Sequence, residues 1–252
     1  MNILALDTTT RSGSVALVID DDVVDERAGD ASRSHAERLP SEILSLLDAH
    51  DLSPSSIDLF AIASGPGLFT GLRIGIATMQ GMALVAGKPM AGVSALAALG
   101  HAAGRDRAAG VRIGVWMDAH RRDVFASLFD VASANDRSPL SAERLIDREG
   151  PTVGDPRATL ARWIAANQRP DLITGDGAVK YREVIAAVDQ SIAVVPDRAL
   201  AGTIGLIARE RARRGDVVPP GGIQPLYVRR PDAELAREHA LADRSADVAR
   251  RD

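Results

Sequence analysis

A short run of acidic and hydroxyl residues near the N-terminus has the composition of a phosphate-binding turn. It follows a predicted strand, precedes Gly13, and consists of Asp7, Thr8, Thr9 and Thr10. Hydroxyl groups and backbone amides in such a hairpin can face a phosphate, which makes these four residues the candidate cofactor site. The same residue types are common in ordinary polar turns. Both interpretations, a binding site and a plain turn, stay open at this point.

Side chains that could bind a metal or attack a substrate are sparse. The histidines are His35, His50, His101, His120 and His239. None lies three to five residues from another, so the sequence has no helical pair of metal ligands. It also lacks a serine nucleophile elbow, a Walker loop and a dinucleotide fingerprint, and without cysteine it has no thiolate. We therefore predict no catalytic residue and no metal site.

Two further residues have both a functional and a structural interpretation. His35 follows Ser34 at a predicted helix start and could cap the helix or bind a ligand, but an isolated histidine is more often structural. Asp176 lies between Gly175 and Gly177 and could line a cleft at a strand end, but glycine-rich turns collect the same residue types. We favour the structural interpretation for both.

The composition limits the classes of partner. The 252 residues are 46% hydrophobic but only 3% aromatic, and the formal net charge is -4. Phosphate contacts need concentrated lysine and arginine, and base stacking needs aromatic rings, so the chain is not expected to hold nucleic acid by itself. No basic segment precedes the first strand, and no apolar stretch approaches the roughly 18 residues of a membrane span. The expected location is the cytoplasm.

The first half of the chain reads as the start of a mixed sheet with helices. Strands are predicted at 2–7, 13–19, 23–28, 59–63 and 90–93, and helices at 35–51, 70–86 and 95–103.

The helix at 70–86 is apolar on nearly every side. It follows the turn Gly65-Pro66-Gly67, with Thr70 as the predicted N-cap. Its core stripe consists of Leu72, Ile76, Met79 and Ala83, and its other stripe of Gly71, Gly75, Thr78 and Met82. Each interior glycine costs roughly 1 kcal/mol against alanine, which indicates that another backbone lies close. That backbone could belong to this chain's own sheet or to a second subunit.

The second half restarts in the same manner after a linker at 104–110. Strands are predicted at 111–117, 124–129 and 172–174, and helices at 156–167, 181–188 and 199–214. We predict an N-terminal lobe at 1–103, a C-terminal lobe at 104–230 and a polar tail at 231–252. The two similar openings suggest an ancient internal duplication.

Several motifs together resemble one known family. They are Asp7-Thr8-Thr9-Thr10, Ser34-His35, the segment from Gly65 to Gly75, Met117-Asp118-Ala119 and Pro225-Leu226-Tyr227-Val228-Arg229. From residue 1 to about 230 the chain resembles the TsaB (YeaZ) family, which acts in threonylcarbamoylation of adenosine 37 of bacterial tRNA. The resemblance implies an α/β fold of two lobes of the actin, sugar kinase and Hsp70 type, with mixed sheets flanked by helices.

The resemblance also implies that the chain is a non-catalytic subunit. TsaD, the catalytic relative of the TsaB family, carries a His-x-x-x-His metal-binding motif, and at the corresponding position this chain has residues Val93 to Ala97, which include no histidine. The expected partner is TsaD, or a second copy of the chain when TsaD is absent, and the ATPase TsaE is expected to dock on the assembled pair. tRNA would be contacted only through the complex. Pairing is predicted through helices at about 36–50 and 70–86, by Leu39, Ile43, Leu46, Gly71, Gly75, Thr78 and Met82.

No cofactor is expected to be required, and a nucleotide would bind the cleft only weakly. The alternative function is a metal- or ATP-dependent glycopeptidase-like hydrolase, because the fold hosts ATP chemistry. That alternative needs a metal site or a nucleophile, for which the sequence offers no suitably spaced residues.

Overall fold

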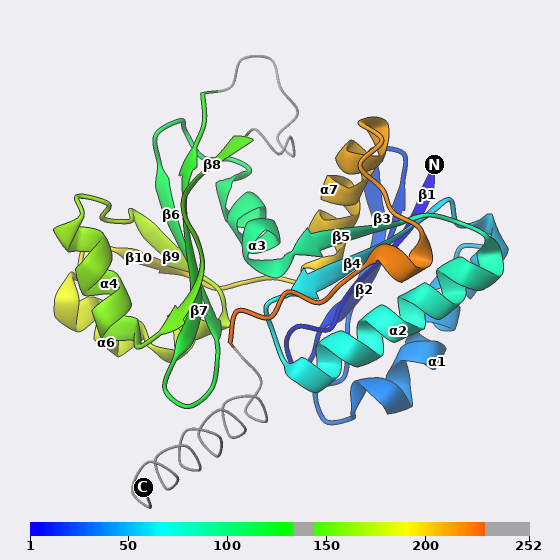
Figure 1. Ribbon diagram of the computed structural model, residues 1–252, viewed down its shortest axis with the longest axis horizontal. Helices are drawn as coiled ribbons and strands as arrows, with labels where there is room; N and C mark the ends of the chain where they lie inside the picture. Colours follow the sequence, from blue (N-terminus) through cyan, green and yellow to red (C-terminus); the bar gives the residue numbers. More distant parts are fainter. Residues whose placement is uncertain (134–143, 230–252) are drawn as a thin grey trace, which may run out of the picture.

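The computed structural model describes residues 1–133 and 144–229 of the chain. The predicted tail at 231–252 lies outside the described residues. Two lobes, each built on a five-stranded mixed sheet, stand next to each other (Figure 1).

The first sheet has the order β3-β2-β1-β4-β5. Its strands are β1 (Asn2–Asp7), β2 (Ser14–Ile19), β3 (Asp22–Ala28), β4 (Leu59–Gly65) and β5 (Met90–Ser94). Neighbouring strands of the β1, β2 and β3 meander pair antiparallel, whereas β4 pairs parallel with β1 and with β5. Side chains alternate along β1: Leu4 and Leu6 enter one core, and Ile3 and Ala5 the other. The sheet is therefore buried on both faces.

The second sheet repeats this topology. Its strands are β6 (Arg112–Asp118), β7 (Val124–Val131), β8 (Leu145–Gly154), β9 (Leu172–Thr174) and β10 (Ala193–Val195). In the order β8-β7-β6-β9-β10 they match the first sheet strand for strand, including the antiparallel meander and the parallel pairs. The predicted α/β fold of two lobes, each with a mixed sheet flanked by helices, is confirmed.

The helices form three layers, one on the outer face of each sheet and one between the two sheets. Side by side over one face of the first sheet lie α1 (His35–Asp48) and α2 (Phe69–Ala86), with the short helix η1 (Pro54–Ser56) beside α2 (Figure 1). Over its other face lie α3 (Ala95–Gly104) and α7 (Ala201–Arg213), and α3 also contacts β6 and β7 of the second sheet. The outer layer of the second lobe consists of α4 (Pro156–Ala165), α5 (Asp176–Lys180) and α6 (Arg182–Val188).

The end of the described chain returns to the first lobe. After β10, α7 packs on the first sheet, the short helix η3 (Pro220–Gly222) contacts α2, and Val218 bridges Met90 at the edge of that sheet. The first lobe is thus made of two separate stretches of chain, one on each side of the second lobe.

The glycine-led helix has the predicted core stripe. Ile76, Met79 and Ala83 are buried with Phe60 and Ile62 of β4. Leu72 is buried as well, at 1% exposure. The helix starts at Phe69 with Leu68 as N-cap, so the predicted Thr70 cap is wrong, and Gly87 ends it in a left-handed conformation with φ 65°.

By length and composition α2 is a candidate membrane span, with 18 residues and a mean hydropathy of 1.2. The prediction that no apolar stretch approaches this length is therefore wrong. A third of the helix, 33%, is buried in the structure. The core helix of a globular domain meets the same length and composition test, and one face of α2 covers the first sheet.

Candidate functional site

The residues predicted as a cofactor site line a cavity between the lobes. This acidic cavity has a volume of about 240 Å³, and its walls include Asp7, Thr9, Thr10, Asp176 and Asp197. Asp7 ends β1, and Asp176 opens α5 at the equivalent edge of the second sheet. Of the two interpretations of Asp176, the structure shows the position in the cleft. Thr8 is absent from these walls, because its side chain faces α2.

Three carboxyl groups set the electrostatics of the acidic cavity. Burial raises the pKa of Asp7 above its usual value, hydrogen bonds from Thr9 oppose the rise, and repulsion by Asp176 and Asp197 adds to it. Burial likewise raises the pKa of Asp176 and of Asp197. Among the lining residues only Arg198 brings a positive charge. Such a cavity repels phosphate groups wherever these carboxyl groups are ionised.

The turn that carries Asp7 to Gly13 is held by α1. Arg38 is buried, with 1% of its side chain exposed, and ion-pairs with Glu42 at 2.6 Å. It also donates hydrogen bonds to the carbonyl groups of Arg11 and Ser12 in the turn. Helix α1 therefore fixes one wall of the acidic cavity from behind.

His35 is part of the same support. Its ring is buried, and burial, followed by the nearby Arg38, lowers its pKa. The ring lies within 4 Å of the Cβ positions of Gly13 and Gly71. This burial between the turn and α2 supports the structural interpretation of His35.

Gly71 and Gly75 of α2 pack against the β1–β2 turn of this same chain. A Cβ atom at Gly71 would lie 2.4 Å from the carbonyl oxygen of Thr8, and one at Gly75 would lie 2.2 Å from Thr8 Oγ1. The prediction that Gly71 and Gly75 form a partner contact is wrong, because the backbone that approaches them is the β1–β2 turn. Leu39, Ile43 and Leu46 are also buried in this chain's own core, at 1%, 1% and 0% exposure.

An apolar groove nevertheless lies on the outer side of the two helices. It has a volume of about 480 Å³ and is lined by Pro40, Ile43, Leu44, Pro54, Ser55, Thr78, Gly81, Met82, Val85 and Ala86. Of the predicted contact residues, Ile43, Thr78 and Met82 belong to these walls. Next to them Leu84 is 71% exposed and Val85 is 90% exposed. We call these lining residues together with Leu84 the α1/α2 face.

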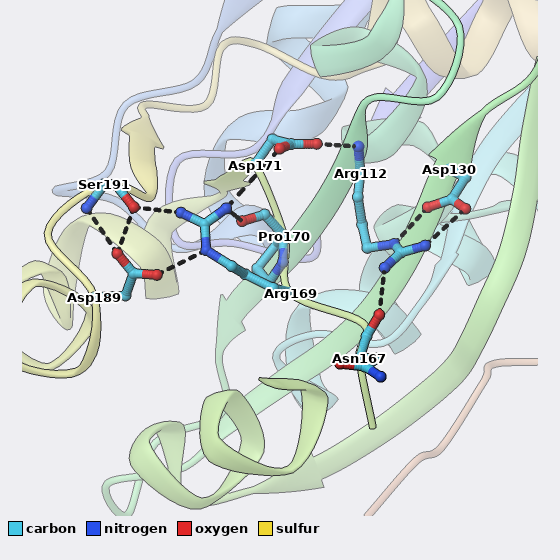
Figure 2. Close-up of polar contacts among 8 residues, drawn as sticks. All are labelled: Arg112, Asp130, Asn167, Arg169, Pro170, Asp171, Asp189 and Ser191. Carbon is cyan, nitrogen blue, oxygen red and sulfur yellow. Dashed lines mark hydrogen bonds and ion pairs between the residues drawn. The ribbon is translucent and has the colours of Figure 1, made fainter. Parts of the chain in front are cut away.

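A charged network at the far edge of the second sheet is structural (Figure 2). Arg112 Nε lies 2.6 Å from Asp130 Oδ1, the Asp171 carboxylate accepts from the Arg112 backbone amide, and Arg169 pairs with Asp189 at 2.7 Å. These contacts tie the starts of β6 and β9 to the end of β7 and the loop before β10. Arg112 holds the pKa of the Asp130 carboxyl below its usual value.

Metal ligands do not gather in the part of the chain that the structure describes. Across residues 1–133 and 144–229, no three His, Asp or Glu side chains lie together as a metal ion would need.

Known proteins match this chain in sequence. A family model of TsaD, tRNA N6-adenosine threonylcarbamoyltransferase, matches residues 27–143. The tRNA threonylcarbamoyladenosine biosynthesis protein TsaB of Escherichia coli K12 is 38% identical over 125 residues, which are 50% of this chain and 53% of that protein. The match thus spans about half the length of that relative. TsaB of Bacillus subtilis 168 is 26% identical over 246 residues, 93% of this chain and 96% of that protein.

Solved structures match it over most of its length. A crystal structure from Pseudomonas aeruginosa, described as an uncharacterized protein with similarity to the peptidase YeaZ, superposes with a TM-score of 0.74 at 28% identity. YeaZ from the same organism gives 0.71 at 27%. Both matches cover 90% of this chain and 99% of the other. In sequence and in fold the chain is therefore similar to TsaB and YeaZ proteins over most of its length.

Proposed function

We propose that this chain takes part in the biosynthesis of threonylcarbamoyladenosine in tRNA, as a non-catalytic subunit that pairs with a TsaD-type transferase through the α1/α2 face. The printed names of the E. coli and B. subtilis relatives support the pathway. The observation that supports pairing with a second protein is the exposed apolar α1/α2 face.

The α1/α2 face has the properties of an interface. None of its lining residues is charged, and the side chains of Leu84 and Val85 project almost fully into solvent. A contiguous exposed apolar surface of this kind marks a contact with another molecule. At Gly81 a Cβ atom would meet nothing within 4 Å, so an approaching helix finds open space at this point.

A related fold is the partner that this surface fits best. The TsaD family model matches residues 27–143, which contain α1 and α2. A TsaD-type protein would therefore present a comparable pair of helices, and two such pairs can pack about a pseudo-twofold axis, as identical surfaces do in a symmetric dimer. By the same reasoning a second copy of this chain occupies the face when TsaD is absent. TsaE docks on the assembled pair in this proposal.

The acidic cavity supports the non-catalytic part of the proposal. Asp7, Asp176 and Asp197 converge in the acidic cavity between the lobes, and their negative charges would repel the phosphates of a nucleotide there. We propose that a nucleotide binds only weakly and is not turned over. Calorimetry with magnesium-ATP and an assay of ATP hydrolysis test this. Stoichiometric metal or turnover above background in the purified chain would favour the hydrolase alternative instead.

Reconstitution tests the function directly. The chain is mixed with the TsaD and TsaE proteins encoded in the same genome, an enzyme that supplies threonylcarbamoyl-adenylate, and unmodified tRNA. Incorporation of labelled threonine into tRNA is then measured with and without the chain. We expect incorporation to depend on it. Equal incorporation in its absence would contradict the proposal.

A further inference from the structure

A second pocket between the lobes differs from the acidic cavity in shape and in charge. Its volume is about 440 Å³, and it lies between the glycine turn at 66–69, the β6–β7 turn at 118–121 and the segment 226–229. In Figure 1 this last segment runs from the first lobe toward the base of β7. We call it the aromatic pocket, because Phe69 and Tyr227 stand at its wall.

The segment 226–229 is fixed to both lobes. The Leu226 amide donates to the carbonyl of Ser64 at the end of β4 at 2.7 Å, and Arg229 Nη1 donates to the carbonyl of Ala119 at 3.0 Å. Arg229 also pairs with Asp123. The pocket wall is therefore built into the fold.

The rings at the wall are exposed in a chain that buries its tryptophans and its other phenylalanines and leaves Tyr181 half-buried. Both tryptophans are fully buried, and of the four phenylalanines, all within the described residues, Phe69 is the exposed one at 45%. Tyr227 is 38% exposed. The two ring centroids lie 5.4 Å apart. Exposed, paired rings offer a stacking surface to a flat ligand.

Cations surround these rings. The Arg73 guanidinium lies 4.0 Å from the centroid of Phe69, and its Nε donates to the Tyr227 hydroxyl at 2.9 Å. Among the lining residues two arginines, Arg121 and Arg229, stand against one carboxylate, Asp118. The first turn of α2, which borders the pocket, has no side-chain cap and no acidic residue, so its amides favour a negative group. This local charge is opposite to the net charge of the chain.

We infer that the aromatic pocket is a binding site for an unpaired RNA base, which stacks on Phe69 and Tyr227 while the arginines neutralise its flanking phosphates. Flat rings next to arginines are the combination by which proteins bind single-stranded RNA. The apolar, uncharged α1/α2 face suits a protein partner better, and the acidic cavity repels phosphates. The inference rests on the proposed function, which supplies tRNA as the nucleic acid, and it gives this chain a direct contact with the RNA.

The test uses the full chain and two labelled RNA probes, a hairpin with an unpaired adenosine-containing loop and a blunt duplex. Fluorescence anisotropy at low salt should show tighter binding of the hairpin. The variant Tyr227→Phe keeps the ring and should bind as the unchanged chain does. Tyr227→Leu combined with Phe69→Leu keeps apolar volume without rings, and should weaken hairpin binding about tenfold or more. Arg73→Gln should lower the slope of log affinity against log salt by about 1.

Control variants are Ile146→Ala, an exposed apolar residue of β8, and Arg213→Gln, an exposed arginine of α7, which should leave hairpin binding unchanged. The inference is overturned if the chain does not bind the hairpin, if duplex and hairpin bind equally, or if the leucine variant binds the hairpin unchanged.

A leucine variant that no longer binds a protein partner but still binds RNA would assign the pocket to protein, which also overturns the inference. If tRNA modification in the reconstituted system depends on the chain but the leucine variant binds RNA unchanged, this inference is wrong and the proposed function stands. If the chain binds the hairpin through these rings but tRNA modification does not depend on the chain, only the proposed function is wrong.

Discussion

The Cα of Gly71 in α2 lies so close to Thr8 that a Cβ atom at position 71 would lie 2.4 Å from the Thr8 carbonyl oxygen. One turn further along, Gly75 has the same relation to the Thr8 side chain. The glycines thus let α2 pack directly on the β1–β2 turn, whose other side forms the acidic cavity. The start of α2 and the wall of the acidic cavity are therefore packed directly against each other.

Gly71→Ala should destabilise the fold. The added methyl group must displace backbone, a change that costs about 1–3 kcal/mol in a well-packed core, whereas alanine's helix propensity returns only about 1 kcal/mol. The matched control is Gly81→Ala in the same helix, where a Cβ atom has open space, and it should stabilise the chain by up to about 1 kcal/mol. Urea unfolding measures both. Equal effects of the two substitutions would contradict the packing described here.

Arg38→Met should also destabilise the fold, because it leaves the carbonyl groups of Arg11 and Ser12 and the Glu42 carboxylate without their donor. A fully buried group left unpaired costs about 1–3 kcal/mol; these partners are part-buried, so the total loss should be about 1–3 kcal/mol. Arg27→Met is the control, since its ion pair with Asp25 has a 37% exposed arginine side chain and such pairs contribute below about 1 kcal/mol. A smaller loss for Arg38→Met than for Arg27→Met in the same unfolding assay would contradict the supporting role of α1.

Asp176→Asn should stabilise the chain at neutral pH. Burial raises the pKa of Asp176 in the folded state, so between its unfolded and folded pKa the folded chain holds the proton more tightly, and stability falls as pH rises through that window. The loss persists at higher pH. Asparagine removes it and keeps the Oδ1 acceptor for the amides of Asp118 and Gly177. The gain should shrink as pH falls through that window and should be gone below the usual aspartate pKa of about 3.9.

Asp130→Asn provides the control of opposite sign. Arg112 lowers the pKa of Asp130, so its carboxylate stabilises the fold above the unfolded pKa and this contribution is lost as pH falls through the folded pKa. The variant should therefore be less stable at neutral pH. Unfolding curves across pH that show the same sign for both variants would contradict the electrostatics of the acidic cavity.

The sequence predicts most elements but not which surface each glycine meets. The helix from 70 to 86 follows from apolar spacing and differs from α2 by one residue at its start. Glycine spacing along it indicates a close backbone approach, yet the pattern is the same whether that backbone is Thr8 or a second subunit. Only the folded position of the β1–β2 turn decides this.

Elements that depend on tertiary contacts were not predictable. β8 contains the charged run from Asp147 to Glu149 and the pair Gly150-Pro151, and it is a strand because β7 offers it an edge. α5 is short and glycine-rich, and its place is set by the close approach of Gly175 and Gly177 to the Trp116 carbonyl. The aromatic pocket joins Phe69 and Tyr227 across the length of the chain, and no local pattern indicates that contact.

The association of the chain through α2 is the central claim, and sedimentation equilibrium with TsaD from the same genome tests it most directly. Val85→Asp places a charge on the α1/α2 face at a side chain that is 90% exposed, so the fold should be unaffected while the heterodimer is lost. Ile146→Asp on β8, exposed at 43%, is the control and should pair normally. We predict a heterodimer mass for the unchanged chain and the control, and separate monomers for Val85→Asp. A heterodimer of full mass and undiminished affinity with Val85→Asp would contradict the account.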